Sequence, residues 1–188
     1  MRTSQRVSHG FQPLGLLASP AFSFVKRILA GVVLTLMLTG GVAAGPFEDG
    51  GAALKRGDYA EALRLWRPLA DQGHADGQLK LGNMYGRGQG VPQDYAEAVK
   101  WYRLAAEQGD AEAQHNLGVS YDRGEGVPQD YVQAHMWFNL AASRAPASER
   151  DEAIKMRNVA ASNMTPEQIG EAQRLAQEWK PKSYAEQY

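Results

Sequence analysis

A repeat with a period of 36 residues is the feature that most constrains how this chain can fold. The letters Gly-Val-Pro-Gln-Asp-Tyr at 90–95 recur unchanged at 126–131. Upstream of them, Leu-Gly-x-x-Tyr occurs at 81–85 and again at 117–121. An internal period in this range is typical of solenoids, in which supersecondary units stack one after another. We therefore divide 45–144 into repeats, with units near 52–73, 74–109 and 110–144, the first lacking the Gly-x-Gly-Val-Pro turn.

Each unit is predicted to form two helices. In the first helix, Gln78, Leu81, Gly82 and Tyr85 share one face at helical spacing. A glycine inside a helix costs roughly 1 kcal/mol relative to alanine. Because this glycine returns as Gly118, we expect a neighbouring helix to approach too closely there for a larger side chain.

The second helix of a unit is predicted to bury Tyr95, Ala98 and Tyr102 together with Ala105-Ala106, with Trp101 at the edge of this face. Its start is marked by an aspartate followed three residues later by Glu or Gln, a capping-box pattern. The three aspartates concerned are Asp58, Asp94 and Asp130. We assign them to helix capping and not to catalysis.

The turn between the two helices carries its own signals. Gly88 and Gly124 can supply the left-handed residue that ends the first helix, and a proline follows each at Pro92 and Pro128. Fourteen residues are assigned to the structural framework of the repeats: Leu81, Gly82, Tyr85, Gly90, Asp94, Tyr95, Trp101, Leu117, Gly118, Tyr121, Gly126, Asp130, Tyr131 and Trp137.

After Arg144 the repeat signature is lost, and 145–188 is predicted to form capping helices and a tail. Ser148 opens one helix, and Thr165-Pro-Glu-Gln opens a second that runs to Trp179. A solenoid needs a polar cover over its last apolar face, which this pair can provide. The fold class predicted for the chain is therefore all-α, an α/α superhelix of stacked helix pairs with C-terminal capping helices.

These letters, at this period, resemble the Sel-one-like repeat (SLR) family of bacterial secreted proteins, which is related to the tetratricopeptide repeat. The resemblance covers about Gly57 to Ala142. It implies an adaptor that binds protein partners and implies no universal chemistry. One branch of the family, rich in cysteine, is associated with β-lactam binding or hydrolysis, and this chain has no cysteine.

The first 44 residues have the pattern of an export signal. Lys26-Arg27 precede an apolar run from Ile28, which leads to the small residues Val42-Ala-Ala44. We predict cleavage after Ala44 and a location in the periplasm or outside the cell. The alternative is an uncleaved membrane anchor, for which the run is short. In that case the signal segment would be the chain's only contact with a membrane.

Composition excludes several classes of function. All 21 acidic residues lie at or after Glu48, so the chain beyond the signal carries 16 positive and 21 negative charges, a balance that argues against nucleic-acid binding. The histidines at 74, 115 and 135 form no metal-binding pattern, and neither a nucleophile–base pairing nor a phosphate loop is recognisable. We expect no catalytic residue, no metal and no cofactor.

Positions that differ between units are better candidates for function. In related arrays the first helices line the surface that binds partners. Four variable residues of the first helices are therefore candidates for partner contact: Lys80, Asn83, His115 and Asn116. The leading hypothesis is a non-enzymatic exported adaptor for a protein or peptide. The alternatives are an envelope enzyme or ligand binder acting on peptidoglycan or β-lactams, and a subunit that stabilises a larger envelope complex.

Overall fold

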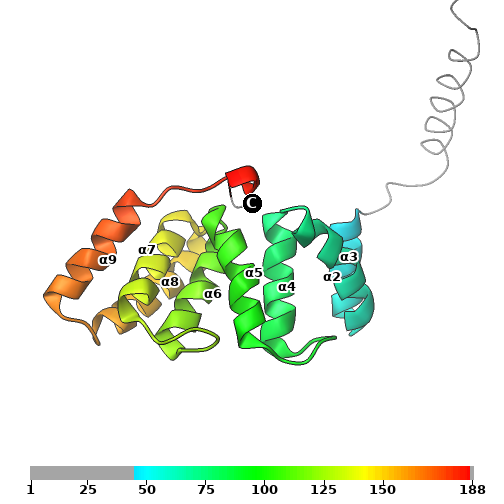
Figure 1. Cartoon of the computed structure of the whole chain (residues 1–188), viewed down its shortest axis with the longest axis horizontal. Coiled ribbons are helices and arrows are strands. Elements are labelled where there is room, and N and C mark those ends of the chain that lie inside the picture. Colours follow the sequence, from blue (N-terminus) through cyan, green and yellow to red (C-terminus); the bar gives the residue numbers. More distant parts are fainter. Residues whose placement is uncertain (1–44, 187–188) are drawn as a thin grey trace, which may run out of the picture. The chain divides into compact units, whose positions relative to one another are not determined.

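The structure is a computed structural model that describes residues 45–186; the predicted export signal lies outside them. Eight α-helices and a final 3-10 turn make up the described part, which confirms the all-α prediction (Figure 1). They are α2 (Pro46–Lys55), α3 (Tyr59–Asp71), α4 (Ala75–Arg87), α5 (Tyr95–Glu107), α6 (Ala111–Arg123), α7 (Tyr131–Arg144), α8 (Ala147–Ala161), α9 (Pro166–Glu178) and η1 (Tyr184–Glu186).

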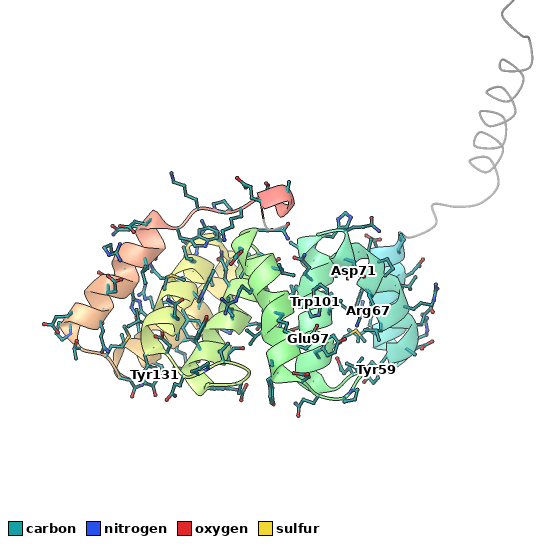
Figure 2. The ribbon with its side chains drawn as sticks, viewed as in Figure 1. Tyr59, Arg67, Asp71, Glu97, Trp101 and Tyr131 are labelled. Carbon is teal, nitrogen blue, oxygen red and sulfur yellow. The ribbon has the colours of Figure 1, made fainter. Side chains whose placement is uncertain are left out.

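The helices pack in the order of the chain. Helices α2, α4 and α6 are first helices, and each packs against the second helix that follows it, α3, α5 or α7. Each second helix also contacts the next first helix, so the pairs stack side by side as Figure 1 shows. The second helices begin along one edge of the stack, where Figure 2 labels Tyr59 of α3 and Tyr131 of α7.

A glycine on each first helix contacts a large aromatic ring on its partner helix. A Cβ at Gly82 would lie 2.5 Å from the ring of Tyr102, and one at Gly118 would lie 2.8 Å from the ring of Phe138. These distances are shorter than any van der Waals contact between carbons. The close helix approach predicted from these two repeated glycines is therefore present.

The first pair contains the same contact at a glycine that the 36-residue offset does not identify. A Cβ on Gly50 of α2 would clash with the indole of Trp66 on α3. Gly50 lies nine residues before the start of α3, whereas Gly82 lies thirteen before the start of α5. The four missing residues belong to the turn, which is shorter in this unit. Helix α2 is thus a first helix displaced in the sequence by four residues, and with 10 residues it is shorter than the 13-residue α4.

The longer turns use glycines in left-handed conformation. Gly88 and Gly124 end α4 and α6 with φ values of 66° and 70°, as predicted. Gly126, with φ of 76°, lies against the backbone of Tyr95 so closely that no side chain fits. The prediction that Tyr95 belongs to the buried apolar face is wrong: it is 41% exposed, because its backbone, and not its ring, meets the turn of the next unit.

The predicted aspartate caps are present at Asp58 and Asp94. The second hydrogen bond of a capping box, from the backbone N–H of the aspartate to the side chain three residues later, is not formed at either one. Asp58 accepts from the backbone N–H of Glu61 at 3.1 Å, and Asp94 from that of Glu97 at 2.9 Å. The Glu61 and Glu97 side chains bond forward to Arg64 and Lys100, so they stabilise the helix surface one turn later. Both hydrogen bonds of a capping box form at Thr165 and Gln168, at the start of α9.

Two fully buried glutamines join consecutive units. The Nε2 of Gln78 donates to the carbonyl of Ala70 at 3.3 Å, and that of Gln114 to the carbonyl of Ala106 at 3.1 Å. In each case the glutamine belongs to a first helix and the alanine to the end of the preceding second helix. An unpaired buried N–H donor is costly, so these two bonds hold consecutive units in register.

The last two helices depart from the pairing of the others. Helices α8 and α9 both pack against α7, and Figure 1 shows α9 standing away from α8. The Arg144 guanidinium lies 4.5 Å above the ring of Trp179, which follows α9, and that ring meets Trp137 edge-on at 6.3 Å. The chain then returns to the end of α5, where Lys182 donates its N–H to the carbonyl of Glu107 at 2.8 Å.

Candidate partner-binding groove

Three adjoining hollows lie on the side of the molecule formed by the first helices. The largest, about 590 Å³, lies between α2 and α4, with Glu112 of α6 also contributing to its wall. One of about 270 Å³ lies between α4 and α6, and one of about 450 Å³ between α6 and α8. Asn83, Glu112 and Asn116 each line two of them. We call this row of hollows the first-helix groove.

All four residues nominated from the sequence line this groove. Lys80 and Asn83 lie in the α2–α4 hollow, and His115 and Asn116 lie in the α6–α8 hollow. The structure therefore brings the nominees to one surface. Their role in binding a partner stays a prediction.

Hydrogen bonds connect the nominees at the middle of the groove. The Oδ1 of Asn83 accepts from the Tyr102 hydroxyl at 2.9 Å and from Nδ2 of Asn116 at 3.2 Å. The Nδ2 of Asn83 in turn donates to Oε1 of Glu112 at 3.4 Å. Both amides are held in one orientation by these bonds, which gives the groove a fixed polar floor between α4 and α6.

Charge completes this network. Burial raises the pKa of Tyr102 to about 12, so its hydroxyl stays protonated and remains a hydrogen-bond donor to Asn83 at neutral pH. The Lys80 ammonium lies 3.9 Å from Oε2 of Glu112. Because both side chains are partly exposed, this ion pair contributes little to the stability of the fold. Its main effect is to orient the Lys80 and Glu112 side chains in the groove.

His115 contributes a neutral ring to the wall of the α6–α8 hollow. Burial lowers its pKa, and this effect outweighs the opposite influence of the carboxylates of Glu152, Glu112 and Glu149. The imidazole lies 5.5 Å from the ring of Phe138, between ring centres. At neutral pH the net charge of this hollow therefore comes from its three glutamates.

The two larger hollows have apolar floors and charged rims. The wall of the α2–α4 hollow includes four large apolar side chains, those of Phe47, Leu54, Trp66 and Met84. The α6–α8 hollow has buried alanines beneath it, Ala141, Ala145 and Ala153. A hollow of this kind can take the apolar part of a side chain while its rim contacts a polar end.

One position of the repeat faces the groove from every first helix. Allowing for the short turn of the first unit, the residues at this position are Glu48, Lys80, Asn116 and Glu152. Sequence reasoning selected the middle two and missed the outer two. The 36-residue offset from Asn116 leads to Glu152, so applying the repeat beyond Arg144 could have found it. Glu48 can be found only after Gly50 is matched to Gly82, which aligns α2 with α4.

A second position contributes cations. Lys55, Arg87 and Arg123 are the last residues of α2, α4 and α6, and all three line the groove. Cations at a helix C-terminus interact favourably with the negative end of the helix dipole, so these residues also stabilise their own helices. Sequence reasoning did not select them.

Two other features, a metal-binding cluster and a membrane-spanning helix, are absent from the described residues 45–186. Residues 45–186 contain no group of three or more His, Asp or Glu side chains placed to hold a metal ion. Within the same range no helix combines the length and apolar character needed to cross a membrane.

Comparison with known families is decisive for classification. The model of the Sel1 repeat matches three times in succession, at residues 45–74, 75–110 and 111–145. The chain belongs to the Sel1 repeat family. The Sel-one-like resemblance inferred from the sequence is confirmed, and the first Sel1 repeat includes α2. Sel1 repeats generally mediate protein interactions and are typically non-catalytic.

Solved structures of other Sel1 repeat proteins have the same fold. One is c5321, described as a protective antigen of uropathogenic Escherichia coli strains displaying an SLR fold, with 32% identity, a TM-score of 0.66, and coverage of 71% of this chain and 29% of that one. Another is a Sel1 repeat protein from Oxalobacter formigenes, with 26% identity, a TM-score of 0.53, and coverage of 72% and 61%.

The Sel1 repeat chain spans under a third of the length of c5321 and about three fifths of the Oxalobacter protein. A search of curated proteins found no match.

Proposed function

We propose that this Sel1 repeat chain is an exported, non-enzymatic adaptor that holds a segment of a partner protein in the first-helix groove. The observation that carries the proposal is the groove itself. Its framework is repeated, yet the residue facing it at one repeat position changes from Glu48 to Lys80, Asn116 and Glu152. A repeated framework with variable contact positions is how solenoids acquire specific partners.

Export is the second part of the proposal. It is supported by the pattern of basic flank, apolar run and small residues that ends at Ala44. Amino-terminal sequencing of the chain purified from the periplasm and medium of its own cells tests it. A chain that begins at Gly45 in these fractions supports export, whereas an intact chain held in the cytoplasm contradicts it.

Site-specific cross-linking in living cells tests the adaptor role. A photo-reactive amino acid placed at Glu48, an exposed residue of the α2–α4 hollow, should give a discrete cross-linked partner, while the same amino acid at Arg64, on the exposed surface of α3, should not. Lys80→Glu should weaken the cross-link because it places a carboxylate beside Glu112. The matched control is Lys100→Glu on α5, and equal loss in both variants would contradict the proposal.

A further inference from the structure

The charges of the first-helix groove are unevenly distributed between its two ends. The α6–α8 hollow is lined by Glu112, Glu149 and Glu152, and no Lys or Arg is among its lining residues. Glu112 and Glu149 lie in the first turns of α6 and α8. This hollow is therefore the acidic end of the groove.

The opposite end carries the cations. The α2–α4 hollow includes Lys55, Lys80 and Arg87, which outnumber its two carboxylates, Glu48 and Glu112, and the smaller α4–α6 hollow adds Arg123. Of these, Lys80 already lies beside Glu112, and Arg123 lies 3.9 Å from Glu125. Lys55 and Arg87 thus remain as the cations best placed to meet an incoming anion.

The shapes of the two ends match different side chains. At the acidic end, the buried Ala141, Ala145 and Ala153 form an apolar floor against which the methylene stem of a Lys or Arg can pack. At the basic end, Phe47, Leu54, Trp66 and Met84 provide a wider apolar wall that can accept a branched or aromatic side chain.

Resting on the proposed function, we infer that the partner segment is bipolar. It presents a Lys or Arg to the α6–α8 hollow, with its stem on the alanine floor and its cation beside Glu149 and Glu152. It presents an Asp or Glu beside an apolar side chain to the α2–α4 hollow, where the carboxylate meets Lys55 and Arg87. Complementary charge at both ends sets the direction in which the segment lies.

The spacing of the two charges follows from the helix packing. The α2–α4 and α6–α8 hollows are separated by the widths of the two helices α4 and α6, roughly 20 Å at a diameter of about 10 Å per helix. An extended segment covers that distance in about six residues. Charges of opposite sign about six residues apart are therefore the pattern expected in the partner.

Selection from a library of random 12-residue peptides displayed on phage, with the full chain as the target, tests this inference. Peptides that bind the wild-type chain and are lost with Lys80→Glu define the groove binders. We expect these peptides to share a Lys or Arg about six residues from an acidic residue with an apolar neighbour. The double variant Glu149→Gln with Glu152→Gln should select peptides without the basic residue.

Matched variants separate charge in the groove from charge elsewhere. Glu61→Gln with Glu97→Gln removes two glutamates from the second helices and should leave the selected pattern unchanged. A synthetic peptide of the selected sequence should bind the Glu149→Gln, Glu152→Gln variant roughly tenfold more weakly than wild type in fluorescence polarisation. Circular dichroism and the Tm of each variant verify that the fold is kept.

The outcomes distinguish this inference from the proposed function. Groove binders with no shared charge pattern, or a pattern that the Glu149→Gln, Glu152→Gln variant leaves unchanged, would overturn the bipolar segment while the adaptor role stands. If no enriched peptide loses its binding in the Lys80→Glu variant, the bipolar segment is overturned, and the cross-link at Glu48 then decides the adaptor role independently.

Discussion

Asn116 donates a hydrogen bond from Nδ2 to Oδ1 of Asn83 across 3.2 Å, joining α6 to α4 in the middle of the groove. The equivalent positions 36 residues later hold Val119 and Glu152, so the bond has no counterpart in the next unit. The same Oδ1 accepts from the Tyr102 hydroxyl, which is buried. Asn83 therefore supports both the groove and the packing beneath it.

Removing this acceptor should destabilise the fold. In Asn83→Ala the Tyr102 hydroxyl loses its acceptor, and we expect the free energy of unfolding to fall by about 1–2 kcal/mol. The double variant Asn83→Ala with Tyr102→Phe removes both partners and should recover most of that loss. Urea unfolding of the four proteins in the cycle measures the coupling, and strictly additive losses would contradict the hydrogen bond's role.

Two adjacent glycines of α2 should respond in opposite directions to alanine. Gly50→Ala forces a methyl group into the Trp66 indole and should destabilise the fold by about 1–3 kcal/mol. Gly51→Ala meets nothing within 4 Å and should stabilise the helix by up to about 1 kcal/mol. Thermal unfolding of the two variants checks this, and equal shifts in Tm would contradict the assignment of Gly50 to the helix contact.

A repeated cross-link between helices reverses its donor and acceptor at the last unit. Arg67 donates to the Tyr85 hydroxyl at 2.5 Å, and Arg103 to that of Tyr121 at 2.8 Å. One repeat further on, Arg157 occupies the tyrosine position and donates to Oδ1 of Asn139 at 3.1 Å. The link between α7 and α8 is thus kept although both residue types have changed.

This reversal predicts a rescue. Asn139→Arg places a second guanidinium against Arg157 and should destabilise the fold by about 1 kcal/mol. Adding Arg157→Tyr recreates the arrangement of the earlier units and should restore the free energy of unfolding to near the wild-type value. Chemical denaturation of the single and double variants measures it. A double variant less stable than Asn139→Arg would show that the α7–α8 link does not follow the repeat.

The repeat period was enough to predict the helix pairs, their turns and the aspartate caps, because each depends on local chemistry that recurs with the same letters. It did not reveal Gly50, since a four-residue deletion in the turn moves that glycine out of phase while its contact with Trp66 is kept. Helical spacing also predicted, wrongly, that Tyr95 is buried. In the structure the turn of the next unit covers the backbone of Tyr95 and leaves its ring exposed.

The candidate groove was predictable in part for the same reason. Lys80, Asn83, His115 and Asn116 were selected because they vary within a clear repeat. Glu149 and Glu152 lie in α8, where the letters no longer match, and were assigned to a polar cap. Helix α8 nevertheless packs against α7 as a further first helix, so extending the 36-residue offset past Arg144 leads to Glu152 even where the letters no longer match.

His135 predicts how stability depends on pH. It is only 4% exposed, its Nδ1 has no hydrogen-bond partner among residues 45–186, and burial, followed by the nearby Arg157 charge, lowers its pKa. A histidine whose pKa is lower in the folded state takes up a proton more readily when unfolded. The free energy of unfolding is therefore not reduced by His135 above the unfolded-state pKa of about 6.5. It decreases as the pH falls below that value.

His135→Val should relieve this dependence, because valine occupies the same repeat position in the preceding unit as Val99, which is also buried. The variant should gain more stability over wild type at pH 5 than at pH 8. Part of the acid sensitivity should remain, since burial also lowers the pKa of His115. Free energies of unfolding at the two pH values measure the gain. The exposed His74 supplies the control, His74→Val, and an equal pH-dependent gain there would contradict the role of burial at His135.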